Sequence, residues 1–407
     1  MHEIAVIGGG LAGLTTALAI ARTGRRTHLI DPDTSRTDAR TTAMLGPTVE
    51  EYRKLGVWDH IEEATAPLRT MRIIDGTRRL VRSPTTTFEA SEIGAEEFGR
   101  NVPNNVATAA LRRAIAGDDH VTVHETLADK IEHRPDGVVV QLTEGRTLDV
   151  GLVIGADGRR STVRQAANIG VREWTYPQTA IVTTFEHRLP HNDVSTEFHT
   201  ENGPATQVPL PGNRSSLVWV TSPTEASELA ALDIDELSAR IESRLAHHLG
   251  RVTVDGPVQT FPMSAQLASA YAGRRTLLVG EAAHAFPPIG AQGFNLTMRD
   301  IVDAASAQRD APDPGAREVT DAYVAMRGRD ADVRTFAIDA LNRSLMNGLL
   351  PVQAAKAVGL GALKALPPLR RLVMREGFQP AARSTLALTN VVAAGVERLR
   401  AAGARRG

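Results

Sequence analysis

The first thirty residues show the clearest pattern of apolar and polar positions. A short apolar run at residues 4–7 leads into a glycine-rich turn at 8–13, a helix-periodic stretch at 14–23 and a second apolar run at 27–30. Short continuous apolar runs are typical of buried strands, whereas recurrence every three to four residues is typical of a helix. The order strand, turn, helix, strand predicts the opening βαβ unit of a doubly wound sheet.

The same two periods predict further elements of this α/β domain. A helix is expected to begin near Pro47, because proline suits the first helical position, and another helix is expected over residues 106–116. Alternating runs around residues 121–123, 138–142 and 148–154 predict strands.

The pattern changes between about residues 175 and 262. Short strands, such as 180–185 and 216–220, are separated there by Pro, Gly and Asn, and one amphipathic helix is expected at 234–249. This segment is typical of a β-rich domain inserted into the α/β domain, whose pattern resumes with the apolar run at 276–279.

Beyond Pro314 the chain is almost wholly helix-forming, with breaks expected at residues 348–351 and 367–368. The net charge of −1 conceals an asymmetry, because the residues from Pro351 onward carry ten Lys or Arg and two Glu, a balance of +8. A basic tail rich in Ala and Leu suits a membrane surface or an acidic partner. A solvated helical face is the alternative.

Composition narrows the class of protein. The 407 residues suffice for two or three domains, and the shares of hydrophobic (42%) and charged (23%) residues are ordinary for a globular protein. The absence of cysteine excludes disulfides, a thiol nucleophile and iron–sulfur clusters. No apolar run approaches the roughly 18 residues of a membrane span, and the N-terminus reads as a strand rather than a signal peptide. We therefore expect a cytoplasmic protein.

The glycine-rich turn carries the first functional motif. Gly8-Gly9-Gly10-Leu11-Ala12-Gly13 fits G-x-G-x-x-G between a strand and a helix, the context in which this motif binds a dinucleotide. Its glycines permit a tight turn, close approach to a pyrophosphate and close packing of helix on strand. Asp31 follows the second strand, where an acid can bind an adenosine ribose. A turn that is merely tight is the alternative.

Two later segments decide which dinucleotide is bound. One is Gly151 to Arg164 with Asp157-Gly158 at its centre, and the other is GEAAHAFPPIGAQGFNL at residues 280–296. With the opening motif they resemble the FAD-dependent aromatic hydroxylases, also called group A flavoprotein monooxygenases, over residues 1 to about 330. The resemblance implies that Asp157-Gly158 lies near the FAD pyrophosphate and is linked to use of the reduced nicotinamide.

In that family the later segment holds the ribityl chain and flanks the flavin ring. The resemblance therefore assigns to the cofactor site Gly280, Glu281, Pro287, Gly290, Gln292, Gly293, Phe294 and Asn295, with Pro288 and Gly293 positioning the ring. Glu281 departs from the Asp that is usual in the family, which leaves the geometry of its contact open. His284 is expected to be structural rather than catalytic, and the sequence names no catalytic side chain.

Two earlier residues match further cofactor contacts of the family. Arg40 matches an arginine that contacts the FAD phosphates or ribityl chain, and its alternative is a surface arginine before a helix. Asn104 matches another flavin contact, and its alternative is a helix N-cap.

Within the family the likeness is greatest to the ubiquinone-biosynthesis hydroxylases of the UbiH/UbiF type, carried by residues 287–296, Arg299-Asp300 and 341–349. The resemblance implies that NADH or NADPH reduces FAD and that the reduced flavin reacts with O2 to a C4a-hydroperoxide, which hydroxylates a phenolic ring bearing a polyprenyl tail. It is also compatible with peripheral contact to the inner membrane, or with a biosynthetic complex, through the basic C-terminal region.

The expected fold is α/β: a Rossmann-like FAD-binding domain with an inserted β-rich substrate domain and a helical C-terminal region. We expect the FAD-binding domain at 1–73, 99–174 and 271–330, the substrate domain at 74–98 and 175–270, and the helical region at 331–407. We expect no metal site and, with 4% aromatic residues, no nucleic-acid partner. The alternatives are another FAD oxidoreductase, such as a reductase or halogenase, and a non-catalytic assembly subunit.

Overall fold

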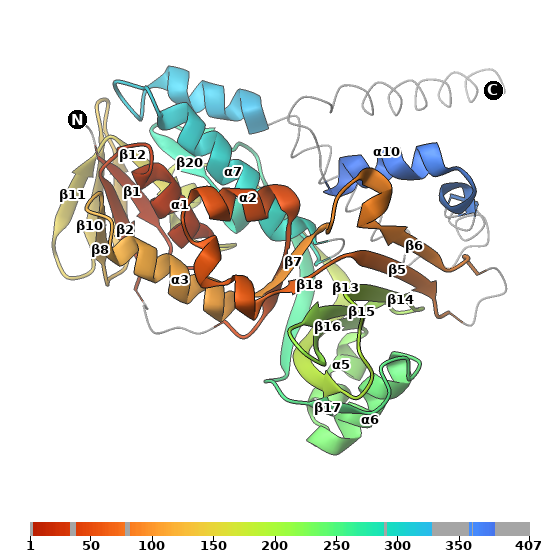
Figure 1. Cartoon of the computed structure of the whole chain (residues 1–407). Coiled ribbons are helices and arrows are strands. Elements are labelled where there is room, and N and C mark those ends of the chain that lie inside the picture. Colours follow the sequence, from red (N-terminus) through yellow and green to blue (C-terminus); the bar gives the residue numbers. More distant parts are fainter. Residues whose placement is uncertain are drawn as a thin grey trace, which may run out of the picture.

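The computed structural model describes residues 3–32, 38–77, 82–288, 291–327, 358–359 and 361–378. Two large sheets lie beside each other, with helices covering the smaller sheet (Figure 1). This mixed α/β architecture confirms the predicted fold class.

The smaller sheet has six strands in the order β19-β20-β12-β1-β2-β8. These are β19 (Ala272–Gly273), β20 (Thr276–Leu278), β12 (Leu152–Gly155), β1 (Ile4–Ile7), β2 (Thr27–Ile30) and β8 (Val121–His124). All pairs are parallel except β19 with β20. Ile4 pairs with Leu152 on one side and with Thr27 on the other, so β1 lies at the centre of the sheet.

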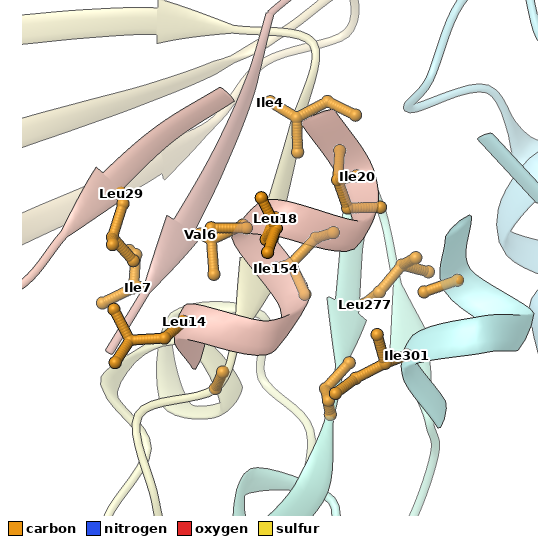
Figure 2. Packing of buried hydrophobic residues seen from close by; sticks show 14 of the residues in the cluster. Ile4, Val6, Ile7, Leu14, Leu18, Ile20, Leu29, Ile154, Leu277 and Ile301 are labelled. Carbon is orange, nitrogen blue, oxygen red and sulfur yellow. The ribbon is translucent and has the colours of Figure 1, made fainter. Parts of the chain in front are cut away.

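Three helices pack around this sheet: α1 (Leu11–Ala21), α3 (Asn104–Ala116) and α7 (Gln292–Gln308). Figure 2 shows Leu14 and Leu18 of α1 among strand residues such as Val6 and Ile154, and all four side chains are buried. Each fully buried side chain of this size stabilises the fold by about 1.5–3 kcal/mol. The helix expected at 106–116 is α3, which begins two residues earlier, at Asn104.

One predicted strand is divided in the structure. The run at 148–154 forms β11 (Thr147–Val150) and β12, which belong to different sheets and meet at Gly151. Because β11 pairs with β10 (Val138–Leu142) and β10 with β9 (Ala128–His133), the chain leaves an antiparallel sheet as it enters the parallel one. Apolar content alone does not mark this change of partner.

The larger sheet follows the order β21-β18-β13-β16-β15-β14-β5-β6, with β17 beside β13. Its strands are β5 (Thr70–Asp75), β6 (Thr86–Glu89), β13 (Val171–His187), β14 (Val194–His199), β15 (Pro204–Leu210), β16 (Arg214–Thr221), β17 (Val252–Val254), β18 (Gln259–Ala268) and β21 (His284–Ala285). A small sheet of β3 (Thr41–Leu45), β7 (Gly99–Pro103) and β4 (Ala66–Pro67) lies between the two large ones (Figure 1).

The expectation of a single helix in the inserted segment is wrong. Two helices are present, α5 (Pro223–Ala230) and α6 (Ile234–Arg244). The side chain of Ser222 caps α5 and Pro223 occupies its first turn, a start signal present in the sequence. The second helix stops short of residue 249, because Ala246 and His247 have positive φ angles, which do not continue a helix.

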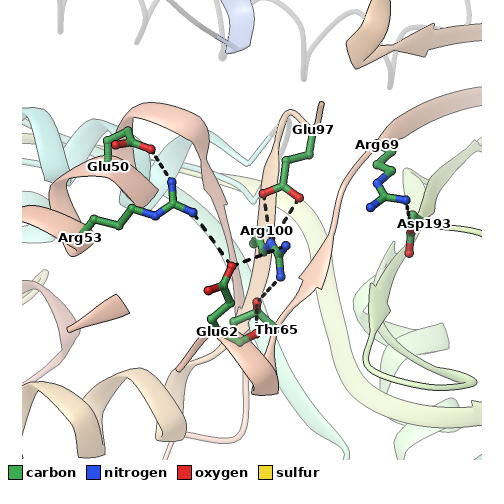
Figure 3. A network of polar contacts seen from close by, with 8 residues as sticks. All are labelled: Glu50, Arg53, Glu62, Thr65, Arg69, Glu97, Arg100 and Asp193. Atoms are coloured by element: carbon green, nitrogen blue, oxygen red, sulfur yellow. Dashed lines mark hydrogen bonds and ion pairs between the residues drawn. The ribbon is translucent and has the colours of Figure 1, made fainter. Parts of the chain in front are cut away.

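Figure 3 shows a network of ion pairs that joins the segments around β7. Arg100 lies 3.0 Å from Glu97 and 3.8 Å from Glu62, while Arg53 on α2 (Gly46–Lys54) lies 2.6 Å from Glu50 and 4.0 Å from Glu62. Several of these side chains are largely exposed, so each pair contributes at most about 1 kcal/mol. The expected helix near Pro47 is α2, which begins at Gly46.

The C-terminal part of the described chain includes helical residues 317–327 and helix α10 (Pro367–Phe378). Helix α10 lies over β5 and β6, and Met374 is buried with Phe88 and Phe98 (Figure 1). The expected break at residues 367–368 is present as the start of α10, whereas the break at 348–351 lies outside the described residues. Within the described chain, no helix has both the length and the apolar character needed to cross a bilayer.

Candidate cofactor site

The predicted motifs meet at one edge of the six-stranded sheet. The 8–13 turn follows β1, Asp31 follows β2, Asp157-Gly158 follows β12 and Gly280-Glu281 follows β20. These four strands are adjacent and parallel, so their carboxyl ends lie side by side. The strand order reverses between β1 and β12, which is where doubly wound sheets bind ligands.

The three motif glycines have different surroundings. A Cβ atom on Gly8 would lie 2.4 Å from the carbonyl oxygen of Ala156, and one on Gly13 would lie 1.8 Å from that of Gly8. A Cβ on Gly10 would meet nothing within 4 Å. Gly8 and Gly13 therefore permit close packing of turn, helix and strand. Gly10, at the N-terminus of α1, leaves open space where a pyrophosphate fits.

Asp31 is buried and paired. Its carboxylate lies 2.6 Å from the guanidinium of Arg112 on α3, which also approaches the carbonyl oxygen of Gly9 at 3.4 Å. A Cβ on Gly9 would lie 1.8 Å from the carboxyl carbon of Asp31, so the acid lies directly against the glycine turn. Sequence reasoning missed Arg112, since nothing in the sequence of α3 indicates its contact with residue 31.

The two carboxylate oxygens of Asp157 differ in their hydrogen bonding. One oxygen, Oδ2, accepts hydrogen bonds from the backbone N–H groups of Thr162 (2.7 Å) and Val163 (3.2 Å) and from the Thr162 hydroxyl (2.9 Å). The other, Oδ1, is buried without a hydrogen-bond partner in the described part of the chain. Buried acceptors are nearly always paired in complete sites, so this atom fits a hydroxyl or N–H donor of a bound dinucleotide.

Arg164 joins two of the predicted segments. Its side chain is buried and donates to the carbonyl oxygens of Ala282 and Arg159, each at 2.8 Å. It therefore fixes the turn after β20 against the Asp157-Gly158 loop. The arginine stands at the end of the motif segment, but its partner 118 residues away cannot be found from the sequence.

Arg40 and Asn104 meet at a common partner, Asp38. The Asp38 carboxylate lies 2.7 Å from the Arg40 guanidinium and accepts a 2.9 Å hydrogen bond from the Asn104 amide. The hydrogen bond to Asp38 raises the pKa of Arg40 above its ordinary value, and the charge of Glu281 acts in the same direction. Arg40 also lies 5.4 Å from the centre of the Phe261 ring. The N-cap alternative for Asn104 is wrong, because its side chain does not cap α3.

Glu281 lies at the exposed side of this cluster. It belongs to the short helical turn η4 (Gly280–Ala282), and its side chain, 55% exposed, lies 3.4 Å from Arg159. Arg159 also donates to Ser264 on β18. The charge of Glu281 also helps to raise the pKa of Arg40, so it acts on arginines of two different loops.

The side chain of Asn295 joins the start of α7 to neighbouring elements. Asn295 accepts from the Leu45 N–H (2.9 Å) and the Thr48 hydroxyl (2.7 Å) and donates to the carbonyl oxygens of Ala43 and Ala291. Its side chain is therefore fully used in joining α7 to β3 and α2, which leaves the backbone for any ligand contact.

The neighbours of Asn295 differ in burial and packing. Phe294 packs edge-on against Tyr52, with ring centres 6.3 Å apart. Gln292 opens the helix, and a Cβ on Gly293 would meet nothing within 4 Å. Pro287 is buried and Pro288 is exposed. Gly290 lies outside the described residues.

His284 is enclosed by protein. Its Nε2 lies 2.7 Å from Oδ2 of Asp300, and both side chains are almost fully buried. His284 also stacks on Phe286, with ring centres 5.5 Å apart. A histidine sealed in this way positions the turn after β20, as expected of a structural residue.

Comparison with known proteins agrees with this geometry. The model of the FAD binding domain family matches residues 1–331, and the chain belongs to that family. It is 34% identical to the ubiquinone hydroxylase UbiL of Rhodospirillum rubrum, covering 92% of this chain and 89% of the relative. It is 30% identical to the 3-demethoxyubiquinol 3-hydroxylase of Escherichia coli, covering 92% and 97%.

The fold is also that of a solved monooxygenase. The crystal structure of p-nitrophenol 4-monooxygenase PnpA from Pseudomonas putida superposes with a TM-score of 0.76 at 18% identity, covering 92% of this chain and 97% of that one. The predictions of FAD as cofactor and of an FAD-dependent monooxygenase are confirmed, and NAD(P)H is the electron donor typical of this class.

Proposed function

We propose that this monooxygenase hydroxylates an electron-rich phenolic ring that carries a polyprenyl tail, in ubiquinone biosynthesis, using O2 and NADH or NADPH. The observation that carries the proposal is that four motif segments meet at the carboxyl ends of the parallel strands, around β1 and β12. The similarity of nearly the whole chain to two hydroxylases of ubiquinone compounds supports the substrate class. When bound, FAD supplies the oxygen-transfer chemistry.

The residues of this chain bind and orient the cofactor. Gly10 and the N-terminus of α1 would hold the pyrophosphate, and Asp31 would bind the adenosine ribose. Arg40, positioned by Asp38 and Asn104, would neutralise phosphate charge or contact the ribityl chain.

The remaining predicted contacts surround the ribityl chain and the ring. We assign Asp157-Gly158, Gly280 and Glu281 to the part of the site that would hold the ribityl chain and pyrophosphate of FAD. We assign Pro287, Pro288 and the backbone of residues 292–295 to the ring. The first turn of α7 contains no acidic residue, which suits a negatively charged ring edge.

An apolar cluster on the larger sheet is suited to the substrate. It contains Tyr176 and Met263 with the partly buried rings of Trp174, Phe261 and Phe286. Phe261 lies under Arg40, and Phe286 lies against His284 in the turn after β20, so the cluster adjoins the cofactor segments. Aromatic and apolar walls bind a phenolic ring and exclude water from the reacting centre.

The function is tested with the purified full chain. We expect bound flavin visible in the absorption spectrum, FAD released on denaturation, and NAD(P)H oxidation accelerated by a phenol carrying a short prenyl chain. An unprenylated phenol is the matched control and is expected to accelerate less. A protein that cannot be reconstituted with FAD contradicts the proposal and favours the non-catalytic alternative.

We extend the proposal to location. The balance of +8 after Pro351 supports a cytoplasmic protein that contacts the inner membrane, or a biosynthetic complex, through its C-terminal region. A polyprenylated substrate partitions into the bilayer, so such contact would shorten its path to the enzyme.

A further inference from the structure

Helix α10 presents three faces of different chemistry. One face turns toward the protein: Met374 is 1% exposed among Phe88 and Phe98, and Arg370, four residues earlier, pairs with Glu92. Since residues four apart share a helix face, these two contacts fix the rotation of α10 about its axis. The other two faces are consequently directed away from the larger sheet.

The second face is apolar and exposed. Leu369, Leu372 and Val373 are 39%, 48% and 41% exposed, and Leu366, whose carbonyl accepts the N–H of Arg370 at the start of the helix, is 53% exposed. Their spacing of three and four residues places them on one stripe. Four neighbouring exposed aliphatic side chains differ from the scattered single ones that are normal on a protein surface.

The third face is basic. Arg371 and Arg375, four residues apart, are exposed beside the apolar stripe, and Lys364 is exposed in the helical turn before α10. Helix α10 contains three arginines and one acidic residue, Glu376 in its last turn. An exposed apolar stripe flanked by Lys and Arg is the pattern of a helix that lies in the plane of a membrane surface.

We propose that the stripe of Leu366, Leu369, Leu372 and Val373, with its basic flank, docks the protein on a bilayer that contains anionic lipids. Charge complementarity selects this occupant, because Lys and Arg side chains near an anionic lipid surface are attracted to it. The aliphatic side chains of the stripe enter the lipid–water interface, while Met374 remains buried against the rest of the protein. This docking surface rests on the proposed function, because it brings the enzyme to the bilayer in which a polyprenylated phenol dissolves.

The test is cosedimentation of the full-length protein with vesicles of phosphatidylethanolamine and phosphatidylglycerol, compared with phosphatidylcholine alone. We expect binding to the anionic vesicles that weakens as salt increases. The double variant Leu369→Glu/Leu372→Glu is expected to lose at least about tenfold in partitioning, and Arg371→Gln/Arg375→Gln to lose most of its preference for anionic lipid. The matched control is Leu127→Glu/Ile234→Glu, two exposed apolar residues (54% and 60%) away from α10, which should bind like the parent.

Three results would overturn the proposal. The first is a parent protein that does not bind anionic vesicles, and the second is a Leu369/Leu372 variant that binds them as the parent does. The third is a parent dimer, detected by ultracentrifugation, that is lost in that variant while neither protein binds vesicles. FAD content and turnover of a water-soluble short-chain phenol are measured alongside. If FAD content or turnover is absent while vesicle binding follows the prediction, the hydroxylase proposal is wrong. If FAD content and turnover are present while vesicle binding fails, the proposed docking surface is wrong.

Discussion

Asp300 and His284 share a buried hydrogen bond of 2.7 Å that links α7 to the turn after β20. The same Asp300 oxygen accepts the backbone N–H of Gly280 at 2.9 Å, and Arg327 lies 2.7 Å from the other oxygen. The pair thus holds the proposed ribityl-binding turn in place against α7.

This arrangement predicts a pH-dependent contribution to stability. Burial alone would raise the pKa of Asp300, but the charges of His284 and Arg327 and the hydrogen bonds hold it below the ordinary 3.8. The stabilisation is therefore complete above pH 3.8 and is lost as the pH falls toward the lowered pKa of the folded state. Asp300→Asn should reduce the free energy of unfolding by about 3 kcal/mol at neutral pH. Urea unfolding at several pH values should show this deficit shrinking in acid, and a constant deficit would contradict the assignment.

Gly10 and Gly13 should respond differently to the same substitution. Gly10→Ala places a methyl group in open space at φ −77°, so the apoprotein should keep its stability while FAD affinity falls about tenfold or more. Gly13→Ala would force a Cβ to 1.8 Å from the backbone oxygen of Gly8 and should destabilise the fold by roughly 3 kcal/mol or more. Thermal melts of the apoproteins and FAD titrations separate the two effects. Equal loss of affinity and stability in Gly10→Ala would argue against a phosphate site there.

Glu281 offers a test of the departure from the family's Asp. Since its side chain is 55% exposed, Glu281→Gln should change the free energy of unfolding by less than about 0.5 kcal/mol. If the carboxylate accepts ribityl hydroxyls, FAD affinity should nevertheless fall several-fold, and Glu281→Asp should retain more of it. Fluorescence titration with FAD measures both variants. Unchanged affinity in Glu281→Gln would leave the residue with only its pairing to Arg159.

Arg112 is expected to be necessary for the buried Asp31. Arg112→Met removes the partner 2.6 Å away and leaves a carboxylate that is 3% exposed without its charge partner. We expect a loss of about 2–3 kcal/mol in stability, because an uncompensated buried charge is costly. The double variant Arg112→Met/Asp31→Asn should recover part of this loss in chemical denaturation. Failure of the second substitution to restore any stability would show that the pair is not coupled.

The sequence predicted the parts of this molecule that depend on local pattern. The βαβ opening, α2 and α3 follow from apolar period and from Pro or Gly punctuation, and the glycine motif marks its own turn. Contacts between distant segments had no local signal. Asp38 joins Arg40 to Asn104, and Arg164 reaches Ala282, only because the sheet brings these loops together.

The two wrong predictions have different origins. The run at 148–154 has apolar residues on both sides of Gly151 although its two halves join different sheets, so hydrophobicity could not reveal the division there. The Ser222-Pro223 start of α5 was a local signal that sequence reasoning overlooked. The exposed stripe on α10 could be assigned only once Met374 and Arg370 showed which face is covered.

The measurement that tests the central claim most directly is incorporation of isotopically labelled O2. The FAD-loaded full chain is supplied with NAD(P)H and a short-chain prenylated phenol, and the product is analysed by mass spectrometry. Our account predicts a product heavier by one labelled oxygen atom, formed only when FAD, NAD(P)H and O2 are all present. Oxidation of NAD(P)H with no labelled oxygen in any phenol would contradict it.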